Sequence, residues 1–153
     1  MQSKTTVWNG LGRMDKLTRE QRHYNMSRIH GKDTQPEIAV RKYLFSRGLR
    51  YRKNDKRLPG HPDIVLPKYK TVVFVNGCFW HGHEGCRFFV WPKQNADFWK
   101  NKITTNIERD SKNYQKLISE GWKVVVVWEC ELSTTRIEQS LLNLYIDIVN
   151  SKN

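Results

Sequence analysis

Three cysteines and one histidine are spaced so that a single metal ion can bind them all, and this spacing limits the possible folds most strongly. Cys78, His83 and Cys86 stand close together as Cys-x4-His-x2-Cys, so one loop can present all three to one ion. Cys130 lies far downstream, directly after an apolar run. We therefore expect a tetrahedral, structural zinc site, in which that run is a strand beside the one that ends at Asn76.

Two alternatives remain open at this site. His81 is two positions from His83 and can serve as the ligand in its place, and Cys130 can be simply a small buried side chain, as free cysteines often are. Three cysteines cannot all pair with one another, and residues 1–14 do not read as a secretory signal. We therefore expect a cytoplasmic, nucleoid-associated protein with reduced thiols, which favours metal binding over disulfides.

The charge of the chain indicates a polyanionic partner. Lysine and arginine number 27 against 15 acidic residues, which gives a formal net charge of +12 and makes nucleic acid the first candidate. The basic residues are dispersed, and no apolar stretch approaches the roughly 20 residues that span a bilayer, so we expect no membrane partner. At 153 residues we predict a mobile arm over residues 1–14 and one domain over residues 15–153.

Capping motifs and apolar periodicity predict the helices. Expected helices run from Thr18 to about residue 29, from Thr34 to Gly48 with Glu37 at a capping position, over 95–120 up to Gly121, and from a capping box at Thr135 and Glu138. One face of the last helix should carry Ile137, Leu141, Leu144, Tyr145 and Ile148. This order leaves three apolar runs for strands.

The apolar runs predict a sheet covered on both faces. Residues 63–66 and 71–75 read as a strand pair joined by 67–70, and residues 123–129 read as a third, buried strand. Because residues 124–128 are apolar at successive positions, helices should lie on both sides of this strand. The sequence therefore predicts an α/β sandwich.

Two carboxylates are candidates for phosphodiester hydrolysis, which magnesium held by carboxylates can support. Asp63 opens an apolar strand, where it either faces an ion or is a turn residue. Asp110 falls on the apolar stripe of the long helix, formed by Ile103, Ile107, Tyr114, Leu117 and Ile118. An inward aspartate needs a partner, either His81 or an arginine. Glu37 is explained by capping, and acts at a magnesium site only if its helix end faces Asp63.

Aromatic residues concentrate around the cysteine-containing loop. They are Phe79, Trp80, Phe88, Phe89, Trp91, Phe98 and Trp99. Phe79 and Trp80 are either core residues or an apolar wedge that unstacks base steps. The sequence by itself leaves both interpretations open.

Several multi-residue motifs follow one another along the chain between about Met14 and Leu132. They are Leu58-Pro-Gly-His-Pro-Asp-Ile-Val65, Gly77-Cys-Phe-Trp-His-Gly-His83, Phe98-Trp99, Glu108-Arg-Asp110 and Trp128-Glu-Cys130. The ensemble resembles the very short patch repair DNA mismatch endonucleases. The resemblance implies a restriction-endonuclease-like fold, with a central mixed sheet flanked by helices and a zinc-stapled loop. It also implies a magnesium-dependent nick 5′ of the thymine in a T:G mismatch.

The resemblance also implies roles for individual residues. Asp63 resembles the magnesium-binding aspartate, with help from the backbone carbonyl of Val75; His81 resembles the general base, Asp110 its partner, and Glu37 a supporting acid. The implied zinc ligands are Cys78, His83, Cys86 and Cys130, and the implied wedge is Phe79, Trp80 and Trp99. The resemblance thus favours His83 over His81 at the zinc.

One position departs from the family pattern, because Asn76 stands where a second catalytic histidine is expected. An amide cannot donate a proton as imidazolium does, although it can hydrogen-bond a phosphate oxygen. An alternative function is therefore a zinc-stabilised protein that binds mismatched DNA without turnover; a structural zinc protein of an RNA-containing assembly ranks last. We expect a monomer that binds duplex DNA with a T:G mismatch and contacts mismatch-repair proteins.

Overall fold

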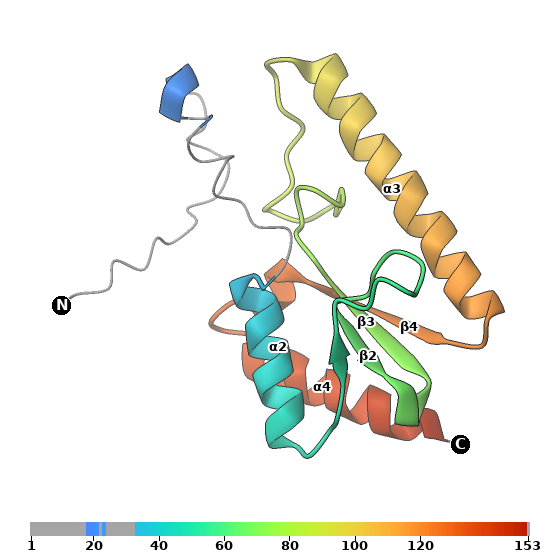
Figure 1. Ribbon diagram of the computed structural model, residues 1–153. Coiled ribbons are helices and arrows are strands. Elements are labelled where there is room, and N and C mark those ends of the chain that lie inside the picture. Colours follow the sequence, from blue (N-terminus) through green and yellow to red (C-terminus); the bar gives the residue numbers. More distant parts are fainter. Residues whose placement is uncertain (1–17, 22, 24–32, 153) are drawn as a thin grey trace.

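The computed structural model describes residues 18–21, 23 and 33–152. It is an α/β structure around a four-stranded mixed sheet in the order β1-β2-β3-β4 (Figure 1). The strands are β1 (Arg52–Lys53), β2 (Ile64–Leu66), β3 (Thr71–Asn76) and β4 (Lys123–Trp128). The helices are α2 (Gln35–Ser46), α3 (Ala96–Ser119) and α4 (Ile137–Val149). The predicted arm over residues 1–14 lies outside the described residues.

The strand pair predicted from the two apolar runs is confirmed. β2 and β3 are antiparallel, with Ile64 opposite Val73, and the short 3-10 turn Pro67–Tyr69 joins them. The two-residue strand β1 pairs with β2 and was not predicted. Both of its residues are exposed and charged, so the sequence there has no apolar alternation to reveal a strand.

β3 and β4 are parallel neighbours, as the zinc hypothesis requires. The register sets Asn76 opposite Trp128, so both strands end at the same edge of the sheet. A parallel pair needs a long crossover connection, which here consists of the loop 77–95 and helix α3. The loop leaves β3 at the edge where Cys130 follows β4.

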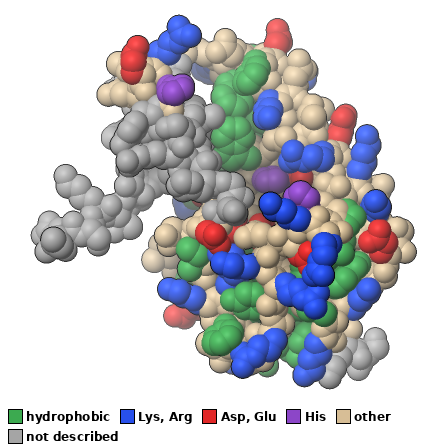
Figure 2. All heavy atoms as spheres, in the orientation of Figure 1, with side chains coloured by type: hydrophobic (Ala, Val, Ile, Leu, Met, Phe, Trp, Pro, Cys, Tyr) green, Lys and Arg blue, Asp and Glu red, His purple; other side chains and the backbone are tan. Residues whose placement is uncertain are grey.

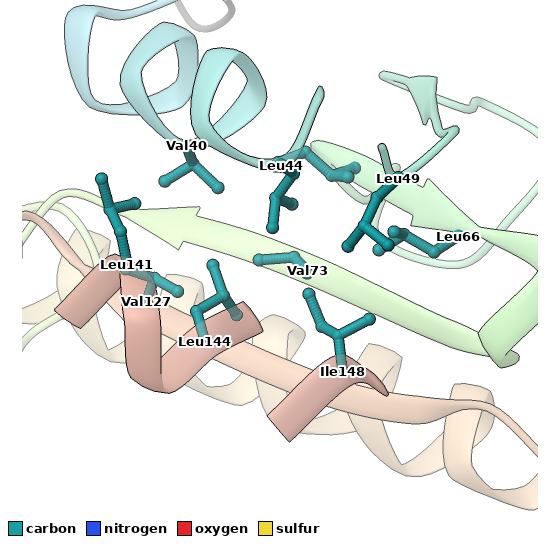
Figure 3. Close-up of a cluster of buried hydrophobic side chains, with 10 residues drawn as sticks. Val40, Leu44, Leu49, Leu66, Val73, Val127, Leu141, Leu144 and Ile148 are labelled. Carbon is teal, nitrogen blue, oxygen red and sulfur yellow. The ribbon is translucent and has the colours of Figure 1, made fainter. Parts of the chain in front are cut away.

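Two apolar layers cover the sheet, one on each face. Figure 3 shows side chains of α2 and α4 meeting on Val73 of β3, and Val127 of β4 belongs to the same cluster. On the other face, Leu117 of α3 packs with Val72 and Phe74. Side chains of β4 alternate between the two layers, so the prediction that this strand is covered on both faces is confirmed.

The helix capping predictions had mixed outcomes. At residues 18–21, Thr18 and Gln21 exchange the two predicted hydrogen bonds, of 3.0 and 3.2 Å; the rest of the first predicted helix, up to residue 29, is mostly outside the described residues. α2 begins after Thr34, whose side chain accepts from the Glu37 amide. The capping box predicted at Thr135 and Glu138 is wrong, because Arg136 is the N-cap of α4.

The buried face of α3 differs from the predicted stripe. Ile103 and Leu117 are fully buried, but Ile107 is 40% and Ile118 59% exposed, so these two residues lie at the margin of the buried face and the prediction that they are buried is wrong. Asn106 is buried instead. The face is therefore partly polar, which a search for apolar residues misses. None of the helices in the described part of the chain has the length and hydropathy needed to cross a bilayer.

Candidate active site and metal centre

The four predicted zinc ligands converge in the structure. The ligand atoms of Cys78, His83, Cys86 and Cys130 all lie within 4.8 Å of one another, and the Cys130 Sγ is 3.5 Å from the His83 Nδ1. A zinc–sulfur distance of about 2.3 Å implies sulfur atoms about 3.8 Å apart in a tetrahedron. The group therefore fits a tetrahedral ion and can hold one.

Hydrogen bonds within the loop and a contact with strand β4 position these ligands. Backbone hydrogen bonds from His83 to Cys78 (2.9 Å) and from Cys86 to His83 (3.3 Å) fold the loop tightly around them. The His83 ring stacks on Trp128, with ring centroids 4.0 Å apart. Because Trp128 ends β4, this stacking brings the loop against the strand that leads into Cys130.

Asp63 directly precedes β2, and its carboxylate is hydrogen-bonded to β3. Its Oδ2 accepts a hydrogen bond from the Val75 backbone N–H at 2.7 Å. Burial is the main reason that the pKa of Asp63 is raised to about 7; the Val75 N–H lowers this pKa, the Glu37 carboxyl raises it, and His81 and Arg41 lower it. These electrostatic interactions mean that Asp63, Glu37 and His81 share one region.

Glu37 is buried close to this carboxylate, near the start of α2. Its Oε2 accepts from the Asp33 backbone N–H at 2.8 Å, so it caps the chain one residue before the predicted position. Burial raises the pKa of Glu37 as well. Arg41, one turn later, lies 3.9 Å from the Glu37 carboxylate and pairs with Asp33 at 2.7 Å. Two desolvated carboxyls are the donor set that a hard divalent cation favours.

His81 and Asp110 form the pair that the sequence left open. The His81 Nδ1 lies 2.5 Å from the Asp110 Oδ2, and both side chains are mostly buried. With Nδ1 engaged by a carboxylate, the neutral imidazole carries its proton on Nδ1 and offers Nε2 as an acceptor. Arg109 approaches Asp110 only at 3.6 Å, so the histidine is the closer partner.

Two residues of this region were not predicted as part of it. The Tyr114 hydroxyl accepts from the Asn76 side-chain amide at 2.9 Å, and the Asn106 side chain donates to the Trp80 carbonyl at 3.0 Å. Both come from the face of α3 that carries Asp110. The sequence did indicate them, because Asn106 and Tyr114 recur at the helical spacing of the buried face of α3, and a polar group that is buried needs a hydrogen-bond partner.

The predicted wedge residues form a small aromatic cluster. Phe79 is only 6% exposed and packs edge-on against Trp80 and Trp99, at 5.4 and 5.3 Å between ring centroids. In this structure Phe79 thus packs as a core residue, while Trp80 and Trp99 are half-buried. Insertion between bases stays a prediction, and for Phe79 it requires the cluster to open.

The surface around these groups is mixed in character. In Figure 2, histidine side chains lie near the middle of the visible face, with lysine and arginine side chains around them and a hydrophobic patch above. A basic rim attracts phosphates, and exposed aromatic edges favour contact with bases. Trp91 (44% exposed) and Phe98 (61%) provide such edges.

The raised pKa of Asp63 predicts how stability depends on pH. In magnesium-free buffer, the folded state binds the proton of Asp63 more tightly than the unfolded state does, because the pKa of Asp63 is about 7 in the folded state and 3.8 ordinarily. The resulting stabilisation is complete below pH 3.8 and is lost as the pH rises to about 7. An Asp63→Asn variant lacks the titration. We expect it to melt above the unsubstituted protein, by a margin that grows between pH 5 and 7 and then levels. A margin that is constant over pH 5–8 would contradict the assigned burial.

Comparisons with known proteins agree on one family. The family model described as DNA mismatch endonuclease Vsr matches residues 14–87. The chain is 57% identical over 129 residues to the type II nicking enzyme V.NmeAIP of Neisseria meningitidis, which covers 84% of this chain and 91% of that protein. It is 47% identical over 133 residues to V.XorIIP of Xanthomonas oryzae (87% and 97% covered). It is 42% identical over 118 residues to the DNA mismatch endonuclease Vsr of Escherichia coli (77% and 73%).

Proposed function

The chain belongs to the Vsr family of DNA mismatch endonucleases, and from this membership we propose that it nicks one strand of duplex DNA on the 5′ side of the thymine in a T:G mismatch. The observation that carries the proposal is the meeting of the His81–Asp110 pair with the buried carboxyl of Asp63. A hydrolase needs both a base and a carboxylate for a cation, whereas a binding module needs neither. We propose a restriction-endonuclease-like arrangement of the sheet and helices on the same grounds.

We assign the base to His81. Its Nε2 takes a proton from the water that attacks phosphorus, and Asp110 orients the ring and stabilises the imidazolium that forms. The 2.5 Å contact of these two side chains supports this division of roles. Because Asp110 lies on the rigid helix α3, the base is held in one orientation.

We assign magnesium binding to Asp63, with the Val75 carbonyl as a further ligand and Glu37 as a supporting acid. When bound, magnesium neutralises the negative charge that develops on the phosphate. The desolvated carboxyls support the assignment, because a nearby cation offsets the cost of ionising them. We assign zinc to the Cys78, His83, Cys86 and Cys130 group, where it staples the loop that carries His81 to β4.

Recognition of the mismatch is proposed for the aromatic cluster. Trp80 and Trp99, with Phe79 behind them, would enter the base stack beside the mismatch, which is less costly to open than paired DNA. Asn106 holds the Trp80 backbone and so fixes the loop against α3. We propose that the protein acts as a monomer on duplex DNA, with mismatch-repair proteins as further partners.

A nicking assay tests the proposed function. Purified protein with magnesium is incubated with a duplex carrying one T:G mismatch, and the same duplex with a T:A pair serves as the control. We expect one nick, immediately 5′ of the mismatched thymine, and none in the paired duplex. Tight binding to the mismatch without any nick would instead support the alternative, a DNA-binding protein without turnover; equal cleavage of both duplexes would exclude mismatch specificity.

A further inference from the structure

Asn76 is a buried amide whose contact with Tyr114 uses only part of its hydrogen-bonding capacity. The residue is 4% exposed, and its Nδ2 donates to the Tyr114 Oη at 2.9 Å. A side-chain amide has two N–H groups. The hydrogen bond to Tyr114 accounts for one of these two N–H groups. The second N–H group of Asn76 has no role assigned to it so far.

The place of Asn76 in β3 puts it among the groups assigned to the reaction. The preceding residue, Val75, binds Asp63 through its N–H, and the following one, Gly77, accepts a hydrogen bond from the His81 backbone. Side chains alternate along a strand. Val75 packs in the layer of α2 and α4, so Asn76 faces α3, the side that carries Asp110.

Two side chains of helix α3 each contact one side chain of residues 76–81. Asp110 and Tyr114 are four residues apart and so lie on one face of the helix; Asp110 contacts His81 and Tyr114 contacts Asn76. The Tyr114 ring also packs on Phe74, 4.8 Å between centroids, which fixes its position. Burial raises the pKa of Tyr114 to about 12, and the charges of Asp110 and Asp63 contribute, so the hydroxyl is neutral and near both carboxylates.

Resting on the nicking activity proposed above, we propose that Tyr114 is a positioning residue. Its hydroxyl holds one N–H of Asn76, so that the second N–H of this amide donates to the oxygen that leaves phosphorus. Water forms the new bond to phosphorus and gives its proton to His81, while the bond to the leaving oxygen breaks. That oxygen is stabilised by the amide N–H and takes its proton from solvent.

This arrangement differs from a second histidine in its response to pH. An amide does not titrate, whereas an imidazolium loses its acidic proton near pH 6.5. The rate of nicking should therefore show no descending limb up to about pH 9. An Asn76→His variant should gain a descending limb, because its imidazolium is lost as the pH rises.

A double-mutant cycle tests the positioning role. Tyr114→Phe keeps the ring but removes the hydroxyl, and should lower kcat for the T:G duplex about tenfold, with KM within about twofold, as expected for a bond that matters in the transition state. In an Asn76→Ala background the same change should lower kcat less than about twofold, because Tyr114 acts through Asn76. Tyr69→Phe, at the opposite end of β3, is the matched control and should nick at the unsubstituted rate.

The outcomes separate this inference from the proposed function. If Tyr114→Phe nicks at the full rate, or if the two losses multiply in the double variant, the positioning role is overturned while nicking stands. If the unsubstituted protein does not nick, both fall. Should Tyr114→Phe melt at a lower temperature, the Asn76→Ala background decides, since a general loss of folding would lower kcat there by the same factor. A descending limb below pH 9 in the unsubstituted enzyme, or none in Asn76→His, overturns the inference.

Discussion

Replacing Asp63 with asparagine is expected to slow nicking of a T:G duplex by about a hundredfold to a thousandfold, the scale seen when one preorganised group that stabilises a transition state is lost. Asparagine keeps the size of the side chain but removes the negative charge that a divalent cation requires. Binding of the mismatched duplex without magnesium, measured by fluorescence anisotropy, should change little. A pure loss of rate would assign Asp63 to the chemistry.

Asp147→Asn is the control for this substitution, because Asp147 is an exposed aspartate on α4 that pairs with Lys123. It should nick at the unsubstituted rate. Asp63→Asn should also melt at a higher temperature in magnesium-free buffer at pH 8, since it removes a desolvated charge. Higher stability together with lost activity is expected of a functional carboxylate. An Asp63→Asn protein that nicks within tenfold of the unsubstituted rate would refute the assignment.

Replacing His83 with glutamine is expected to remove the zinc and, with it, the structure of the loop. Structural zinc sites contribute several kcal/mol or more to folding, so the melting temperature should fall by roughly 10 °C. Nicking should be lost as well, because the loop carries His81. The measurements are zinc content by atomic absorption and thermal unfolding followed by circular dichroism.

Two other histidines serve as controls for the zinc prediction. His61→Gln changes an exposed histidine outside the metal group and should keep about one zinc per chain and its melting temperature. His81→Gln should also keep the zinc, while it loses the proposed base. If His81→Gln lost the metal and His83→Gln kept it, the alternative ligand set that the sequence left open would be correct, and the base would have to be sought elsewhere.

Sequence reasoning succeeded where the signal was local or tied to a fixed chemistry. The Cys-x4-His-x2-Cys spacing, with Cys130 after an apolar run, predicted that β3 and β4 are neighbours, and the register of Asn76 with Trp128 confirms it. The placement of Asp110 on an inward helix face predicted that it needs a partner, and the structure shows that His81 is closer to it than Arg109. In both cases the residues have a bonding requirement, for a metal ion or for a partner of a buried carboxylate, that few arrangements of the chain can meet.

Predictions from the sequence were wrong or missing where the local pattern is compatible with more than one structure. β1 has no apolar residue to mark it, and Thr135 and Glu138 form a capping motif that α4 does not use. Ile107 and Ile118 fit the helical period of α3, yet they lie at the exposed margin of its buried face. Periodicity gives the spacing of a face but not its width or polarity, which depend on what packs against it.

The amino-acid sequence alone indicated a metal-binding group of three cysteines and one histidine, the α/β order and the family, because these follow from residue types and spacings that few other arrangements allow. The structure brings His83, not His81, to the three cysteines. Only the tertiary structure decided that Asn76 meets Tyr114 across β3 and α3 and that burial raises the pKa of Asp63. The physical reason is that desolvation and a contact between distant segments depend on the packed surroundings. A linear sequence does not contain those surroundings until the sheet and its helices have assembled.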